Sequence, residues 1–129
     1  MKQFKNVILP VLLATIWISI SEFVRNELLL KSLWTNHYKE LGLTFPSDPV
    51  TNIGWGIWSM MLAIAIFIIS KKFTLWQTTF LSWFVAFAMM WVVIGNLSVL
   101  PHMLMLYALP LSLFETFIAT LIIKKIIKQ

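Results

Sequence analysis

The chain has 129 residues and a mean hydropathy of +0.87, with 60% hydrophobic and only 12% charged residues. Soluble domains contain about 45 to 50% apolar and about 25% charged residues, so this composition excludes an ordinary soluble domain and indicates an integral membrane protein. The chain has no cysteine, which excludes disulfides, Cys-based zinc sites and thiol redox chemistry. Because a membrane span needs about 20 apolar residues, the length predicts a single all-α domain, residues 1–129, with four transmembrane helices in a compact bundle.

The formal net charge of +5 arises from lysines that lie at the ends of apolar segments. This distribution is typical of a topology signal and not of a groove that binds DNA or RNA, so we expect no nucleic-acid partner. Seven lysines fall on one predicted side of the bilayer: Lys2, Lys5, Lys71, Lys72, Lys124, Lys125 and Lys128. We therefore predict a multi-pass protein of the inner (plasma) membrane with both termini cytoplasmic.

The first predicted span covers about residues 6–30, with Pro10 early enough to be tolerated in its first turns. No small-residue cleavage site follows its apolar run, so we expect a retained span and not a signal peptide. Beyond Asn26 the apolar residues stay on one side of a helical wheel, which predicts an amphipathic interfacial extension over about residues 28–41. It either lies in the headgroup plane or projects as a tail of the first helix, and Gly42 offers its stop.

The second predicted span, residues 49–70, begins with Asp48 as N-cap and Pro49 at the first helical position. A tight turn follows, in which Thr74 and Gln77 form a capping-box pattern before the third span.

The third span is expected over residues 75–97 and the fourth over residues 104–126. Pro110 lies within the fourth segment, so we expect a kink or a short surface segment before the membrane helix proper.

Glu115 is the most costly residue of the chain in a bilayer. At 1.5 Å per residue it lies about 13 Å from the boundary marked by Lys124, near the bilayer middle, and no basic residue is predicted at its level. Its helix face carries Ser112 between small residues that admit another helix closely. Two readings stay open: a proton-carrying or cation-coordinating carboxylate in a cavity, or a neutral Glu hydrogen-bonded to Thr15, Ser82 or a tryptophan N–H.

A polar stripe runs along the first span. Thr15, Ser19, Glu22 and Asn26 follow one another at helical spacing, so they share one face that must meet protein or water and not lipid.

Arg25 can pair with Glu22 within one helical turn. The first reading is an interfacial salt-bridge cluster with snorkelling side chains, and the second is the mouth of a polar cavity whose floor is Glu115. The predicted vertical gap between the carboxylates of Glu22 and Glu115 is about 12 Å, too far for a catalytic dyad but suitable for two stations on a path.

No catalytic constellation is present in the sequence, because nucleophile elbows, phosphate loops and triads are absent. His37, Tyr38 and Glu40 follow no metal-ligand spacing, so we predict no metal and no cofactor.

The motif IWISISEF in the first span, Leu33 and Trp34 after it, and the proline-interrupted last span carry a family resemblance. With these features the chain resembles small four-helix bacterial integral membrane proteins that are classed as domains of unknown function. The resemblance implies the four-span fold and supplies no established activity, partner or site residue.

The sequence favours a small oligomeric transporter or channel for protons, cations or a small polar solute. Its predicted transport residues are Glu115, Glu22, Asn26, Thr15, Ser19, Ser112 and Arg25. The alternative is a non-catalytic membrane subunit or scaffold. A third reading is a lipid-modifying enzyme with His37, Tyr38 and Glu40 at headgroup level. Four short spans enclose little volume, so we expect the lipid bilayer and either a homo-oligomer or a partner membrane protein as partners.

Overall fold

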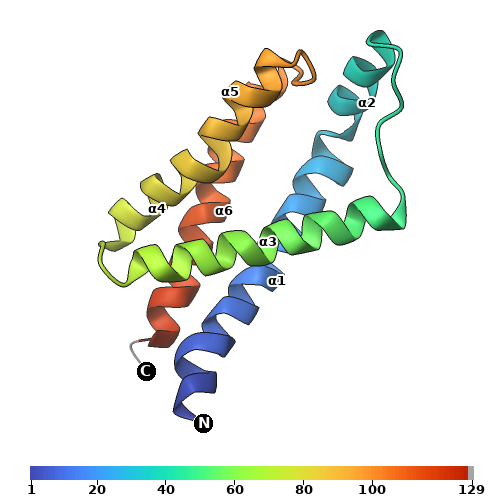
Figure 1. Cartoon of the computed structure of the whole chain (residues 1–129). Helices are drawn as coiled ribbons and strands as arrows, with labels where there is room; N and C mark the ends of the chain where they lie inside the picture. Colours follow the sequence, from blue (N-terminus) through green and yellow to red (C-terminus); the bar gives the residue numbers. More distant parts are fainter. Residues whose placement is uncertain (128–129) are drawn as a thin grey trace.

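The computed structural model describes residues 1–127, which form helices joined by short turns, with no strand among them (Figure 1). Four of the described helical segments are long and apolar enough to cross a membrane: Phe4–Leu29, Pro49–Ser70, Leu75–Asn96 and Leu104–Ile127. These bounds lie within two residues of the predicted spans. The architecture is therefore all-helical and compatible with a multi-pass membrane protein.

The first segment consists of three continuous pieces. The π-helical turn η1 (Phe4–Ile8) leads into α1 (Leu9–Phe23), which is followed by the π-helical segment η2 (Val24–Leu29). Pro10 lies at the junction of η1 and α1, so its missing N–H falls where the π-helical turn gives way to the α-helix. At Leu30 the backbone leaves the helical region, with φ −114° and ψ 8°.

Helix α2 (Lys31–Glu40) continues from η2 after the bend at Leu30, as the predicted amphipathic extension. Leu33, Trp34 and Tyr38 are partly buried on one side, whereas Lys31 and Lys39 are exposed. Gly42 ends the helix with φ 75°, and the N–H groups of Gly42 and Leu43 bond back to the carbonyls of Lys39 and Tyr38. The stop predicted at Gly42 is thus confirmed, because glycine adopts this left-handed conformation without strain.

Helix α3 (Pro49–Ser70) begins at Pro49 as predicted, with Asp48 in the N-cap position. The Asp48 carboxylate does not cap the backbone, however, and instead accepts a hydrogen bond from the Thr51 hydroxyl.

The turn after α3 leads into α4 (Leu75–Trp83) through the predicted capping box. The Gln77 N–H donates to the Thr74 hydroxyl oxygen, and the Thr74 N–H donates to the Gln77 side chain. The π-helical segment η3 (Phe84–Ala88) and α5 (Met89–Asn96) complete the third long segment. Helix α6 (Leu104–Ile127) contains Pro110 without interruption, so the predicted surface segment before the fourth span is limited to the turn at residues 101–103.

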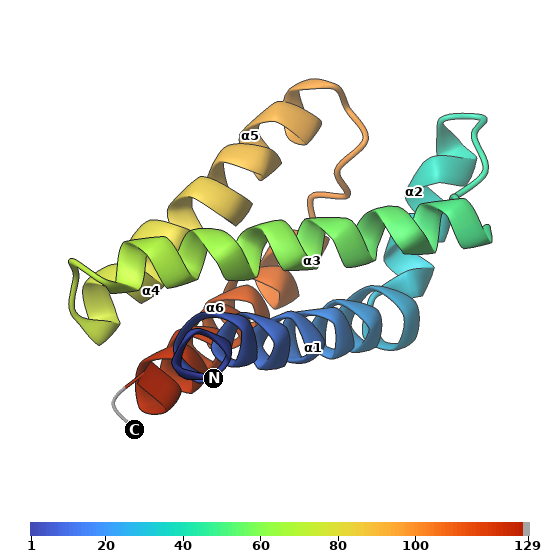
Figure 2. The same ribbon diagram turned by 60° about the horizontal axis from the view of Figure 1, so that its bottom comes forward.

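Helix α1 packs against both α3 and α6, and α4 packs against α6. Figure 2 shows α3 lying between α1 on one side and α5 on the other. Small side chains allow the close approach of α1 and α6, since Ala14, Ala108 and Ala119 are almost fully buried. The described core therefore forms where α1, α3 and α6 meet.

The start of the chain and the end of α6 lie at the same end of the molecule (Figure 1). The Lys124 ammonium donates to the carbonyls of Ser70 and Phe73, at 2.9 and 2.8 Å, which ties the end of α6 to the turn between α3 and α4. Lys71 belongs to this turn, so predicted topology lysines from distant parts of the chain lie together. Lys128 lies outside the described residues.

Candidate functional site

A buried cluster of three charged side chains joins the first and last long helices. Glu22 is in the last turn of α1, Arg25 is in η2, and Glu115 is in the middle of α6. The Nη2 atom of Arg25 lies 2.6 Å from Glu22 Oε1, and its Nη1 atom lies 3.6 Å from Glu115 Oε1. One guanidinium therefore lies between two carboxylates.

These three side chains are almost inaccessible to solvent. The exposed fractions are 4% for Glu22, 6% for Arg25 and 0% for Glu115. The predicted pairing of Arg25 with Glu22 is confirmed, but the pair is buried and its side chains do not snorkel as expected. The expectation that no basic residue lies level with Glu115 was wrong. Depth arithmetic on straight helices failed because Arg25 extends its long side chain into the protein, toward two opposite charges, instead of snorkelling outward.

Two of the described π-helical segments, η2 and η3, contact each other at this cluster. The Arg25 guanidinium carbon of η2 lies 5.2 Å from the centre of the Phe87 ring, which η3 supplies. Such segments widen a helix by one residue and recur at functional sites. Sequence reasoning missed both Phe87 and the π-helical turns, since neither segment contains the Gly or Pro that marks a helix irregularity.

A chain of hydrogen bonds links the cluster to α2. The Asn26 amide donates to Glu22 Oε2 at 2.9 Å, and the Trp34 indole N–H donates to Asn26 Oδ1 at 3.2 Å. The position of α2 is thus coupled to the orientation of the Glu22 carboxylate.

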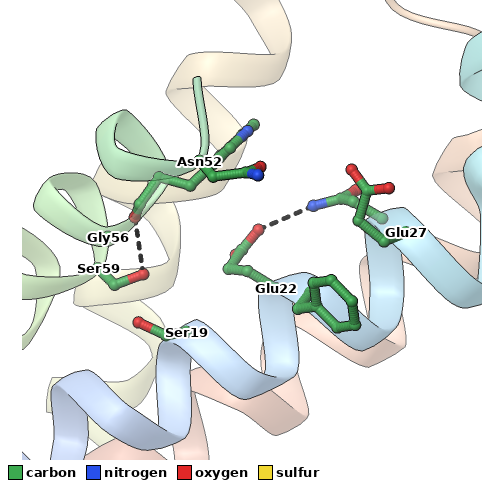
Figure 3. A pocket seen from close by; sticks show the side chains of 9 residues that line it. Ser19, Glu22, Glu27, Asn52, Gly56 and Ser59 are labelled. Atoms are coloured by element: carbon green, nitrogen blue, oxygen red, sulfur yellow. Dashed lines mark hydrogen bonds between the residues drawn. The ribbon is translucent and has the colours of Figure 1, made fainter. Parts of the chain in front are cut away.

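A cavity of about 290 Å³ separates the polar stripe of α1 from α3. Figure 3 shows Ser19 and Glu22 on one wall and Asn52, Gly56 and Ser59 on the other. Ser19, Glu22 and Asn26 therefore face a space whose lining combines polar side chains with the rings of Phe23 and Trp55.

Thr15, the fourth residue of the stripe, does not line this cavity, and its hydroxyl donates to the carbonyl of Val11 at 2.7 Å.

A second cavity, of about 200 Å³, lies beside α2 and shares Glu22, Asn26, Glu27 and Trp55 with the first. Arg25 also lines it. The rest of its lining is apolar, half of it aromatic (Trp34, Tyr38, Phe45, Trp55 and Trp91) and half aliphatic (Met90, Ile94, Val99, Leu104 and Ala108). The two cavities therefore adjoin at a shared set of residues that includes two carboxylates and the Asn26 amide.

Glu115 borders neither cavity, and in residues 1–127 its carboxylate oxygens accept no hydrogen bond. The Trp17 indole donates to the backbone carbonyl of Glu115 at 2.8 Å, and the Trp83 indole donates to the Ser112 hydroxyl at 2.9 Å. The predicted hydrogen bonds from Thr15, Ser82 or a tryptophan to the carboxylate are therefore not formed. Arg25 lines the second cavity, and Glu115 lines neither. The predicted cavity floor is therefore Arg25 and not Glu115.

The histidine and acids predicted at headgroup level do not form a joint site. His37 Nε2 lies 2.8 Å from the Ser98 carbonyl oxygen, where it bridges α2 and the turn after α5, and Glu40 is exposed. Neither borders either cavity, whereas Tyr38 borders the second one. In the described part of the chain, no three His, Asp or Glu side chains gather as metal ligands would.

Comparison with known proteins gives no relative: no protein-family model matches this chain, and neither does any curated protein or solved structure.

Proposed function

We propose that this protein is a small membrane transporter or channel that passes protons or cations along the cavities at Glu22. The observation that supports it is the buried cluster, in which two carboxylates share the single guanidinium of Arg25. With all three groups ionised, the cluster carries one negative charge in excess. A buried excess charge is costly, so the cluster favours taking up a proton or a cation.

Glu22 and Glu115 have different roles in this proposal. Glu22 borders both cavities and is the group that an incoming proton or cation meets. Glu115, which is fully buried, competes with Glu22 for the Arg25 guanidinium. When Glu22 is neutralised, Arg25 pairs more closely with Glu115, and this exchange provides two states of the same cluster.

The setting of this function is part of the proposal. We propose that the chain spans the inner (plasma) membrane with both termini cytoplasmic, since seven of its nine lysines fall at the ends of apolar segments on one predicted side of the bilayer. The cavities of one chain are small, so we propose that a homo-oligomer or a partner membrane protein completes the pathway.

The test is ion flux in liposomes that contain the purified protein. Wild type should give proton or cation flux above empty vesicles, whereas Glu22→Gln and Glu115→Gln should reduce it to the vesicle background. Glu40→Gln is the matched control, because Glu40 is exposed and borders neither cavity. The proposal is wrong if wild type conducts no better than empty vesicles, or if both cluster variants conduct like wild type.

The second candidate is a non-catalytic membrane subunit or scaffold. The observation that favours it is the complete burial of Glu115 away from both cavities, which suits a charge cluster that fixes helix packing. In that case Glu115→Gln changes the stability or assembly of the protein, and a fixed partner co-purifies with wild type.

A further inference from the structure

The partly aromatic cavity beside α2 indicates which cation the proposed transporter binds. From its walls we infer that the ligand is a small monovalent organic cation with an apolar body, such as a quaternary ammonium compound, and not a bare metal ion. The inference deepens the proposed function, on which it rests, by naming the substrate class of the Glu22 site.

Three rings close one side of this cavity. The Phe45 ring lies 5.8 Å from Trp34 and 5.2 Å from Tyr38, and Trp34 and Tyr38 are 6.3 Å apart, measured between ring centres. All three rings border the cavity. Aromatic faces attract cations electrostatically, and cages of several rings recognise quaternary ammonium groups.

Glu22, which Asn26 links to the ring of Trp34, supplies the charge in the same lining. Glu22 is buried, and its carboxylate is shared between Arg25, whose Nη2 lies 2.6 Å from Oε1, and the Asn26 amide, which donates to Oε2 at 2.9 Å. Glu27, which also borders the cavity, is already paired with Lys31 at 3.2 Å. The lining thus offers the single excess negative charge of the cluster, which suits a monovalent cation.

The same lining is a poor site for a metal ion. Metal cations with oxygen ligands need about six ligands arranged around them, and most of this cavity is lined by rings and apolar side chains. Arg25 also occupies the position between the two carboxylates where a metal would have to lie. An organic cation avoids this conflict, because it binds mainly through ring faces and needs only one nearby carboxylate.

The experiment measures binding of radiolabelled choline to the intact protein in detergent. Unlabelled choline should displace the label, whereas its neutral carbon analogue 3,3-dimethylbutan-1-ol and potassium ions at the same concentration should not. Tyr38→Leu and Phe45→Leu should each weaken choline binding by about 2- to 30-fold, the range expected for loss of one cation–π contact. Glu22→Gln should also weaken it.

The control variants separate a lost ring from a damaged fold. Tyr107→Leu removes an exposed tyrosine that borders neither cavity and should bind choline like wild type. Tyr38→Phe keeps the ring and should restore binding. The inference is overturned if the neutral analogue or potassium competes as well as choline, or if Tyr38→Leu and Phe45→Leu bind choline like Tyr107→Leu.

Binding and flux distinguish this inference from the proposed function. Glu22-dependent proton or potassium flux without choline binding would overturn the substrate class and leave the transporter standing. Glu22-dependent choline binding in a protein that passes no ion and no choline would overturn transport and leave the binding site.

Discussion

Arg25 Nη1 lies 3.6 Å from Glu115 Oε1, although the two residues belong to the first and last long helices. The same guanidinium contacts Glu22 at 2.6 Å. Arg25 therefore links the first and last long helices through a buried ion cluster.

Removing the guanidinium should destabilise the fold strongly. Arg25→Met leaves Glu22 and Glu115 buried without their shared counter-ion, and breaking a buried pair costs about 3 to 5 kcal/mol. The free energy of unfolding in mixed detergent micelles measures this loss.

The matched control for Arg25→Met is Lys31→Met, which breaks the more exposed pair with Glu27. We expect a loss of less than about 1 kcal/mol, because solvent screens such pairs. Equal unfolding free energies for the two variants would contradict a buried ion cluster.

Glu115→Gln should cost far less than Arg25→Met. The change removes the excess negative charge and leaves the Glu22–Arg25 pair intact, so we expect a change within about 1 kcal/mol of wild type in the same unfolding assay. A loss as large as that of Arg25→Met would mean that Glu115, and not Glu22, is the principal counter-ion of Arg25.

The hydrogen bond from Trp34 should hold α2 against the cluster. Trp34→Phe keeps an aromatic ring but removes the donor to Asn26, which contributes about 0.5 to 1.5 kcal/mol. Amide hydrogen exchange should become faster in α2 (Lys31–Glu40) and unchanged in α6. Trp76→Phe, at an exposed tryptophan on α4, is the control and should leave exchange in α2 at the wild-type rate.

Asp48 gives a prediction for acidic pH. The hydrogen bond from the Thr51 hydroxyl holds the pKa of this exposed carboxyl below its ordinary value. Because the folded pKa is lower than the unfolded one, the contact stabilises the start of α3 above the unfolded pKa. This stabilisation is lost as the pH falls through the folded pKa.

Carbon-13 NMR titration of the Asp48 carboxyl group checks this prediction directly. Thr51→Val should raise the pKa of Asp48 toward the ordinary aspartate value, whereas Thr35→Val, at an exposed residue of α2, should leave it unchanged. An Asp48 pKa that is the same with and without the Thr51 hydroxyl would contradict the hydrogen bond.

The start of α3 at Pro49 and the capping box of Thr74 and Gln77 were predictable from the sequence. So was the stop at Gly42. These features depend on neighbouring residues alone, because N-caps, proline at the first helical position and a left-handed glycine act within one turn. The long apolar segments follow from composition for the same reason.

The sequence also identified Glu22, Arg25 and Glu115 as residues that need an explanation, since charge within apolar helices is costly wherever it lies. Tertiary structure alone decided that they form one cluster, because the direction of the Arg25 side chain depends on a carboxylate from the last helix. It likewise placed Phe87 under the guanidinium and brought Phe45 beside Tyr38. Contacts between distant segments depend on helix tilt, π-helical turns and side-chain packing. No periodic pattern or residue spacing in the amino-acid sequence predicts these features.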